Sequence, residues 1–383
     1  MTSEITRVVG RVRGERPGPT LIVVGGIHGN EPGGVIAARR VLARIDAERI
    51  PIRGELLCLA GNVGALREKK RYLARDLNRL WTPDRVGLLP ANGSPTNGSG
   101  DPEATEQREL SAAIEEALAN ARGEAYLVDL HTTSAEGIPF ALIGDTLRHR
   151  EFASHFPLPV ILGLEEQVDG ILVEHMTHRG CVTLVVEGGQ HQNPVSWEHL
   201  EAVLWLALAA AGNATAEAIA DHHRHYAQLE RARGSLPRVM EVTFRHPVGP
   251  ADQFRMMPGF ANIARVRRHQ LLARDRRGEI RAPSDGMVFL PLYQPQGDDG
   301  FFLGRGVSGL RMQASAVARR LRLDRLLPLL PGVRRDPERR DRLDVDTEIA
   351  RLYPMDVFHL FGYRKVRQRG AHLEVARRPH DPE

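Results

Sequence analysis

The chain has 383 residues, more than is usual for a single domain, and this length predicts one large domain followed by a smaller one. Hydrophobic residues make up 42% and charged residues 26%, as in ordinary globular proteins. No apolar stretch approaches the roughly 20 residues of a membrane span, and no secretory signal is visible. The two cysteines, Cys58 and Cys181, lie in apolar strand-like runs, which excludes a disulfide framework. We therefore expect a cytoplasmic protein without a membrane partner.

The net charge of +4 originates in the C-terminal segment. From Arg311 to the end, 17 basic residues stand against 11 acidic ones, whereas the preceding residues are slightly acidic. A basic segment of this kind can bind nucleic acid. Acidic residues are interleaved throughout it, however, and no series of aromatic residues accompanies the arginines. A solvated or salt-bridged surface is the better interpretation, and we expect no nucleic-acid partner.

The first half of the chain alternates apolar strand-like runs with helical patterns. The runs predict strands at 20–26, 55–60, 126–130, 139–143, 159–163 and 182–186. Helical patterns cover about 31–47, 102–121 and 196–233, and an irregular region from 61 to 101 ends in a turn-rich series. Runs rich in Val, Leu and Ile that are separated by helices favour an α/β fold: a mostly parallel mixed sheet with helices on both faces.

The pattern changes after residue 234. Short strand candidates at 239–245, 261–267, 271–273 and 287–293 are separated by Gly, Pro and Asp, which predicts a small β-rich domain. We therefore divide the chain into a first domain, residues 1–234, and a C-terminal β-rich domain, residues 235–383, which includes the Arg-rich tail.

Three short segments with metal-binding residue types follow predicted buried strands. The first, Gly25-Gly26-Ile27-His28-Gly29-Asn30-Glu31-Pro32, offers one nitrogen and one oxygen donor, and the others contain His131 and Glu187. Ligands of open α/β sheets bind beyond the carboxyl ends of the strands, so these side chains are expected to converge. Two histidines and one glutamate form a catalytic zinc set with a fourth position left for water. A carboxylate outside the metal shell then serves as the general base.

Each of these residues also has a simpler interpretation when it is taken alone. His-x-x-Glu occurs by chance, a histidine after a strand is often a hydrogen-bonded structural residue, and Glu187 could be an acid at a helix N-terminus. Asp129 shares a strand face with His131, so it either orients that ring or caps a neighbouring turn. Arg71 to Arg79 is rich in arginine, which suits carboxylate recognition but is also common in exposed loops. The joint occurrence of the segments favours a zinc site.

The motifs resemble, in order and spacing, those of the succinylglutamate desuccinylase and aspartoacylase family, which belongs to the wider zinc carboxypeptidase-like fold. The resemblance covers about residues 15–215 and rests on Gly26-x-His28-Gly29-Asn30-Glu31, Asp76-Leu77-Asn78-Arg79, Asp129-x-His131 and Glu187-Gly188. It implies one zinc ion per chain, bound by His28, Glu31 and His131. It further implies the following roles: Glu187 as the catalytic base, Asn78 and Arg79 as ligands of the substrate carboxylate, and Arg71 as the group that polarises the scissile carbonyl.

One position departs from the family pattern. Aspartoacylases carry a further substrate-binding arginine ten residues before the catalytic glutamate, and this chain has Thr177 there, beside His178 and Arg179. Strict specificity for N-acetylaspartate is therefore not expected. Tyr293 is a candidate for the C-terminal tyrosine that reaches the substrate in the family.

The expected function is zinc-dependent hydrolysis of the linear amide of a small N-acyl amino acid, in amino-acid metabolism. The first alternative is a zinc carboxypeptidase acting on short peptides. The second is a non-catalytic, zinc-stabilised nucleic-acid-binding protein, against which Glu187 argues, because a structural zinc site is closed and has no use for a base. The acyl group, the amino acid and the oligomeric state, a homo-oligomer included, are left open by the sequence.

Overall fold

The computed structural model describes residues 5–87, 100–349, 355–369 and 371–381. Most of the turn-rich series predicted before residue 101 lies outside these residues. In chain order, with η for a 3-10 helix, the first part contains β1 (Val8–Arg13), β2 (Thr20–Gly25), α1 (Gly33–Glu48), β3 (Glu55–Ala60), α2 (Val63–Glu68), η1 (Leu77–Arg79), α3 (Pro83–Val86), α4 (Pro102–Ala119), β4 (Ala125–Thr133), β5 (Phe140–Ile143), α5 (Leu147–Ser154), β6 (Val160–Leu162), η2 (Leu164–Glu166), α6 (Leu172–His178), β7 (Val182–Gln190), α7 (Pro194–Ala211), η3 (Ala216–Ala218) and α8 (His222–Arg233).

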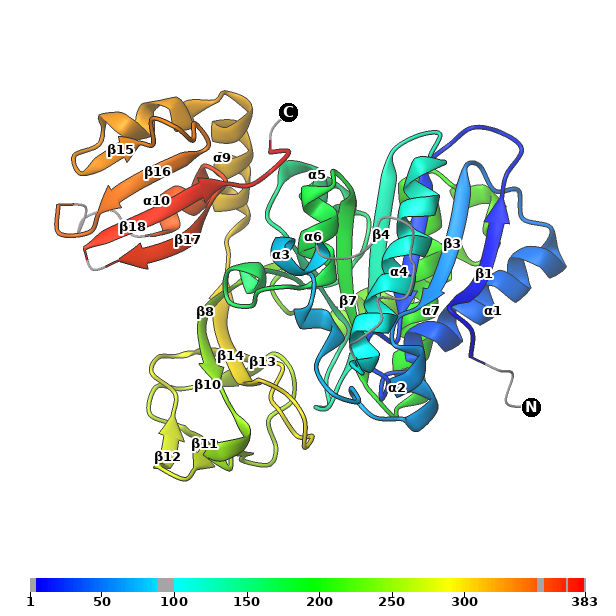
Figure 1. Cartoon of the computed structure of the whole chain (residues 1–383), viewed down its shortest axis with the longest axis horizontal. Coiled ribbons are helices and arrows are strands. Elements are labelled where there is room, and N and C mark those ends of the chain that lie inside the picture. The colour runs from blue at the N-terminus through cyan, green and yellow to red at the C-terminus, as the bar shows by residue number, and fades with distance from the viewer. Residues whose placement is uncertain (1–4, 88–99, 350–354, 370, 382–383) are drawn as a thin grey trace.

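The second part continues with β-strands and a few short helices (Figure 1). Its elements are β8 (Val239–Pro247), η4 (Pro250–Asp252), β9 (Arg255–Met256), β10 (Ala264–Val266), β11 (Leu271–Asp275), β12 (Gly278–Arg281), β13 (Gly286–Phe289), β14 (Asp299–Gly306), α9 (Gly309–Arg320), η5 (Leu323–Leu329), β15 (Val333–Arg335), β16 (Arg342–Asp346), α10 (Met355–Leu360), β17 (Tyr363–Arg369) and β18 (His372–Arg377).

The predicted fold class is confirmed by the large sheet. Its described strands run in the order β1-β3-β2-β4-β7-β5-β6-β8-β14-β13-β10. Strand β2 pairs in parallel with β3 and β4, and β4 pairs in parallel with β7. Strands β1 and β5 are antiparallel to their neighbours β3 and β7. The sheet is therefore mixed, with a parallel centre.

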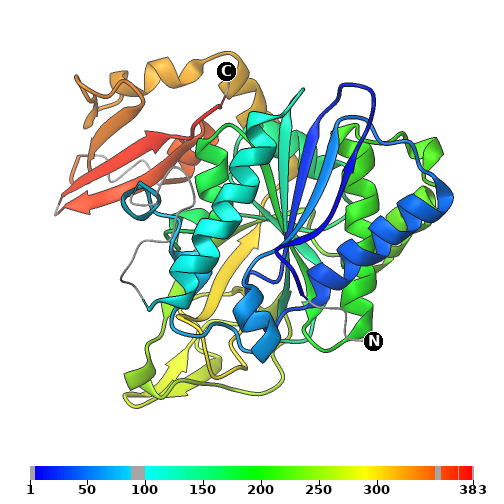
Figure 2. The same cartoon turned by 45° about the vertical axis from the view of Figure 1, so that its right-hand side comes forward.

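Helices cover both faces of this centre, which explains why its strands are apolar throughout. Along β2, Leu21 and Val23 pack with residues of α1 and α7, whereas Ile22 and Val24 pack with residues of α4 and α6. Figure 2 shows α4 (cyan) on one side of the sheet and α1 (blue) with α7 (green) on the other. Each strand thus supplies two hydrophobic cores, because successive side chains point to opposite faces.

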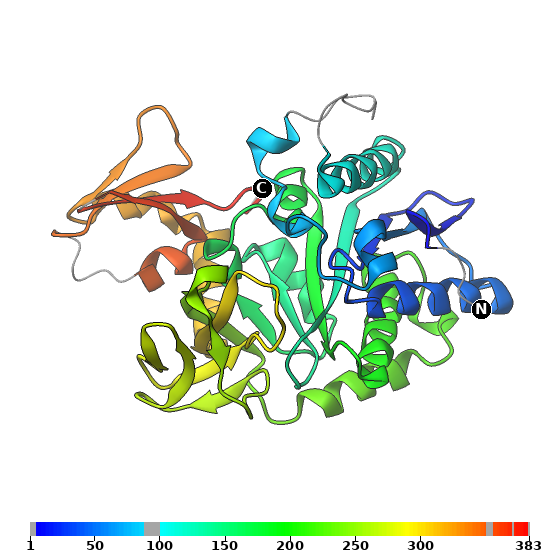
Figure 3. The ribbon, with the colours of Figure 1, turned by 60° about the horizontal axis from the view of Figure 1, so that its bottom comes forward.

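The large sheet extends into the second part of the chain. The predicted boundary after residue 234 falls between α8 and β8, and β8 pairs in parallel with β6, so the sheet crosses that point. The division into two domains stays a prediction. Two smaller sheets follow, β12-β11-β9 and β15-β16-β18-β17. The four-stranded sheet stands to one side of the large one (Figures 1 and 3) and has its own core, to which η5 and α10 contribute Leu327 and Phe358.

The described part of the Arg-rich tail is folded, and several of its arginines form ion pairs as predicted. Arg342 pairs with Glu374 on the four-stranded sheet. Two buried arginines attach this segment to the first part of the chain: Arg319 Nη2 lies 2.6 Å from Asp145 Oδ2, and Arg378 Nη2 lies 2.9 Å from Glu165 Oε1. Among the described residues, no helix combines the length and the apolar character that crossing a membrane requires.

Candidate metal centre and active site

The loop between β2 and α1 positions the first pair of candidate ligands. Gly26 has a φ of +69°, a conformation that side chains disfavour, and permits the sharp turn out of β2. At Gly29 a Cβ would lie 2.1 Å from the carbonyl carbon of Ala65, so no side chain fits there. The loop therefore packs tightly, and it projects His28 and Glu31 over the carboxyl edge of the sheet. The amide of Gly29 also donates to the carbonyl oxygen of Arg71 at 3.0 Å, which brings that arginine to the site.

Strands β4 and β7 supply the other two residues. Both strands run about three residues further than their apolar runs predict, and His131 and Glu187 lie in these extensions. The two residues are partners in the parallel register of β4 and β7. The convergence predicted from the strand ends is thus observed for these side chains.

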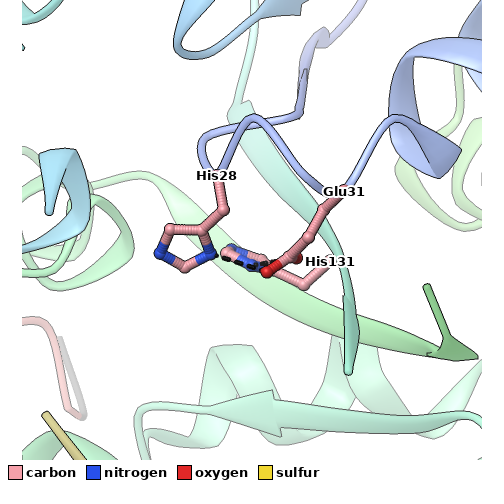
Figure 4. A group of neighbouring side chains, drawn as sticks. All are labelled: His28, Glu31 and His131. Atoms are coloured by element: carbon pink, nitrogen blue, oxygen red, sulfur yellow. Dashed lines mark hydrogen bonds and ion pairs between the residues drawn. The ribbon is translucent and has the colours of Figure 1, made fainter. Parts of the chain in front are cut away.

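His28, Glu31 and His131 form one buried cluster (Figure 4). The Nδ1 atoms of His28 and His131 lie 2.9 Å and 3.2 Å from the two carboxylate oxygens of Glu31. One ligand atom from each residue falls within 4.8 Å of the other two. This spacing is short enough for the three residues to share one metal ion.

A second carboxylate holds the outer nitrogen of each ring. His28 Nε2 lies 3.1 Å from Asp76 Oδ1, and His131 Nε2 lies 3.0 Å from Asp129 Oδ2. Such contacts fix the orientation of a metal-binding imidazole and leave its other nitrogen for the metal. The residues therefore fit a zinc ion, since two histidine nitrogens and one carboxylate are the donors that a catalytic zinc site uses. Of the two interpretations of Asp129, contact with His131 is the one observed, and the similar role of Asp76 was not predicted.

Glu31 is held in its ionised form. Burial acts to raise its pKa, but the imidazoles of His28 and His131 outweigh this effect and keep the pKa well below its usual range. The carboxylate also accepts hydrogen bonds from the backbone amide of Thr132 at 3.0 Å and from Arg71 Nη1 at 3.3 Å. A negatively charged oxygen ligand is thus available at the centre of the cluster.

Glu187 differs from Glu31 in its environment. Burial, together with the negative charges of Glu31 and Asp129, raises the pKa of Glu187 to about 8, against the lowering effect of His131 and Arg71. Its Oε2 atom is buried and has no hydrogen-bond partner among the described residues. A carboxyl with a pKa near neutrality and a free oxygen beside the cluster is suited to accept and donate a proton.

Three further predicted residues, Arg71, Asn78 and Arg79, line the same pocket. Arg71 Nη2 donates to Asp76 Oδ2 at 3.1 Å, and Asn78 Oδ1 accepts from the amide of Leu172 at 2.9 Å. Arg79 Nη2 lies 3.0 Å from Asp299 Oδ2. The pocket is lined by all of the residues to which the family resemblance assigns a metal-binding, catalytic or carboxylate-binding role, and Tyr293 is not among its lining residues.

The structure adds residues that the sequence did not predict. The segment between β13 and β14 forms one wall of the pocket with Leu290 and Gln294, and the first residue of β14, Asp299, continues this wall. Gln294 Oε1 accepts from Asn30 Nδ2 at 2.7 Å and lies 3.1 Å from His191 Nε2. No sequence signal marks these contacts, because their partners are more than 100 residues apart along the chain.

Tyr293 and Thr177 do not line the candidate active-site pocket. The hydroxyl of Tyr293 donates to the carbonyl oxygen of Met257 at 2.7 Å and accepts from the amide of Phe260 at 3.0 Å, and Tyr293 is not among the residues lining the pocket. Thr177 is buried on α6, and its Oγ1 lies 2.9 Å from that of Thr183. The side chain of Tyr293 therefore does not line the pocket, although its backbone amide donates to Oγ of the lining residue Ser134 at 3.0 Å.

A buried cluster of two histidines and a glutamate at the carboxyl edge of a mostly parallel sheet, with a further carboxyl beside it, defines an α/β protein with a candidate catalytic metal centre. The chain belongs to the succinylglutamate desuccinylase/aspartoacylase family, because the sequence model of the succinylglutamate desuccinylase/aspartoacylase catalytic domain matches residues 17–208. This match contains the three candidate metal ligands together with Arg71, Asn78, Arg79 and Glu187, whereas Tyr293 lies outside it.

Similar proteins agree with this assignment. A succinylglutamate desuccinylase from Burkholderia thailandensis is 29% identical over 129 residues, which are 33% of this chain and 35% of the relative. The chain thus matches about a third of the length of this curated relative. A crystal structure of a succinylglutamate desuccinylase/aspartoacylase from Rhodobacter sphaeroides has a TM-score of 0.57 at 21% identity and covers 78% of this chain and 88% of that one. The product-bound ectoine utilization protein of Ruegeria pomeroyi has a TM-score of 0.54 at 22% identity, with 77% and 87% covered. At these identities the two structures establish the fold.

Proposed function

We propose that the protein is a zinc-dependent deacylase that hydrolyses the amide bond of a small N-acyl amino acid. The observation that carries this proposal is the pair of imidazoles that turn Nδ1 toward Glu31 while Asp76 and Asp129 hold their outer nitrogens. A carboxyl with a raised pKa lies beside them in the same pocket. Membership of the family supports the same activity.

His28, Glu31 and His131 are the residues that would hold the zinc. When bound there, zinc lowers the pKa of water and polarises a carbonyl group. Glu187 takes a proton from the attacking water and later delivers it to the nitrogen of the leaving amino acid. The Oε2 atom of Glu187, which has no hydrogen-bond partner among the described residues, is consistent with this role in the same pocket.

The arginines of the pocket would act on the substrate. Arg71 lies next to the cluster, where its guanidinium can donate to the oxygen of the scissile carbonyl as negative charge develops on it. Asn78 and Arg79 would bind the carboxylate of the amino acid, for which the planar fork of arginine is suited. Arg79 is paired with Asp299, so the substrate carboxylate would share or replace this partner.

A screen by mass spectrometry tests the proposal. The zinc-loaded protein is incubated with N-acetyl, N-formyl and N-succinyl amino acids and with short peptides, and the Glu187→Gln variant serves as the control. Release of a free amino acid from N-acyl amino acids by the wild-type protein alone would support the proposal. Trimming of peptides with no turnover of N-acyl amino acids would replace it with a carboxypeptidase activity. The cytoplasmic location stays a prediction.

A further inference from the structure

A second pocket lies directly beside the candidate active site. It is bounded by β5, β7 and α6 of the first part and by Arg364, Arg378 and Pro379 of the C-terminal segment. The two pockets share a wall of apolar side chains, because five residues line both of them: Leu142, Leu164, Ile171, Val173 and Val185. The second pocket is therefore adjacent to the space around the metal-ligand cluster.

Side chains of strand β7 line both pockets. Thr183, Val185 and Glu187 point to the same face of the sheet, because side chains alternate along a strand. Glu187 lines the first pocket, Val185 lines both, and Thr183 lines the second. At about 3.3 Å per residue, the second pocket begins roughly 7 Å from Glu187 along the strand and continues to roughly 13 Å. A group attached to a substrate beside Glu187 can span this distance.

The chemistry of the second pocket favours an uncharged, apolar occupant. Apolar atoms form most of the surface of its wall. Four charged side chains also line it, and they are already paired: Arg364 with Glu174, and Arg378 with Glu165. The hydroxyl of Thr177, the neutral residue at the position that departs from the family pattern, donates to the carbonyl oxygen of Val173 at 2.8 Å. A charged group would lose its hydration there, and to bind Arg364 or Arg378 it would have to compete with a carboxylate that is already paired with that arginine.

We propose that the second pocket is a substrate subsite for an apolar group, so that the protein prefers N-acyl amino acids that carry a sizeable apolar group over those with a second carboxylate. This inference rests on the proposed deacylase function. The apolar group can belong to the acyl chain or to the amino-acid side chain, since both are attached close to the scissile amide.

Two substrate series distinguish these sources. In the first, glycine carries acetyl, butanoyl, hexanoyl or octanoyl groups. In the second, the acetyl group is constant and the amino acid is alanine, leucine or phenylalanine. We expect kcat/KM to rise along one series by about threefold to fourfold for each methylene buried, and the best member to exceed N-acetylaspartate and N-succinylglutamate. The series that rises identifies the source.

Gly144 offers a way to fill the second pocket. It lines this pocket and not the first, its φ is not positive, and a Cβ built on it meets no atom within 4 Å. Gly144→Leu should lower kcat/KM at least tenfold for the largest apolar substrate and leave the smallest member of that series within twofold of wild type. Gly309→Leu is the matched control, because Gly309 has equally open space and lies outside both pockets.

The outcomes separate this inference from the function on which it rests. Turnover with no rise along either series, or a preference for the dicarboxylate substrates, would overturn the subsite and leave the deacylase function standing. If Gly144→Leu lowered kcat/KM equally for all substrates, the subsite would also be overturned. If no substrate is turned over, the deacylase function fails, and calorimetry with N-octanoylglycine decides the subsite: binding that Gly144→Leu abolishes supports it, and absence of binding to wild type contradicts it.

Discussion

His131 and Glu187 are register partners on the adjacent parallel strands β4 and β7. The sheet itself therefore holds a candidate metal ligand and a candidate base side by side. His131 faces Glu31 through Nδ1 at 3.2 Å, whereas Glu187 Oε2 has no hydrogen-bond partner among the described residues. The two neighbouring side chains therefore have different hydrogen-bond environments, which is consistent with separate roles.

The first prediction concerns the metal. We expect His28→Ala and His131→Ala to lose most of the zinc that wild type retains after dialysis, because the two remaining protein ligands rarely hold zinc tightly. His223→Ala is the control, since His223 is exposed on α8. Metal content measured by mass spectrometry decides the matter, and full zinc occupancy in both variants would place the metal elsewhere.

The second prediction concerns Asp76 and Asp129, which hold the outer nitrogens of the two rings. Asp76→Asn and Asp129→Asn should each weaken zinc binding by roughly 10- to 100-fold, since an amide orients and polarises the imidazole less well than a carboxylate. Competition with a zinc chelator measures this affinity. The exposed Asp84→Asn variant should match wild type, and an unchanged affinity in both test variants would contradict the role of these carboxylates.

The third prediction concerns Arg79. Arg79→Lys keeps the charge but loses the planar fork, so it should reduce kcat/KM strongly, and Arg79→Ala more so, by roughly 2–4 kcal/mol of transition-state stabilisation. A substrate whose carboxylate is converted to an amide provides the comparison. Wild type should discriminate sharply against it, whereas Arg79→Ala should barely distinguish the two. The same preference in both proteins would show that Arg79 does not bind the carboxylate.

The fourth prediction follows from the pKa of Glu187, which burial raises from 4.5 to about 8. In the metal-free protein the unfolded chain loses this proton near pH 4.5, whereas the folded chain keeps it until about pH 8. The contribution of Glu187 to stability is therefore present below pH 4.5 and is lost as the pH rises through 8. Each pKa unit corresponds to about 1.4 kcal/mol, so the effect is measurable.

Melting temperatures in the presence of a chelator test this pH dependence. Glu187→Gln cannot ionise, so between pH 4.5 and pH 8 it should become progressively more stable relative to wild type. If the melting temperatures of the two proteins change with pH in the same way across this range, the pKa of the carboxyl of Glu187 is not raised in the folded protein.

The strands at the centre of the sheet could be predicted because buried parallel strands are apolar on both faces. Strand β3 has the predicted bounds, Glu55–Ala60. The ends of β4 and β7 could not be predicted from the sequence. Polar and glycine residues of the site, such as Thr132 and Gly188, continue these strands but interrupt the apolar pattern. The predicted helix at 196–233 is two helices, since Gly212 with a φ of +85° ends α7.

A β-rich C-terminal part was predicted, but the individual strands of the four-stranded sheet were not. Its strands alternate apolar and charged residues, as in Leu343 and Val345 on β16, and the many arginines obscure this short pattern. The convergence of His28, Glu31, His131 and Glu187 was predictable because parallel strands end at a common edge. The contact between Arg79 and Asp299 was not, because it depends on how a distant antiparallel hairpin folds back onto the sheet.

The central claim is that the metal ligands and the base are separate groups, and Glu187→Gln tests it most directly. Zinc content and turnover of N-acyl amino acids are measured on the same sample of this variant and of wild type. We predict unchanged zinc content and a turnover rate lower by about 10²–10⁴, the usual effect of removing a positioned general base. Loss of zinc together with activity would make Glu187 a ligand and contradict the account.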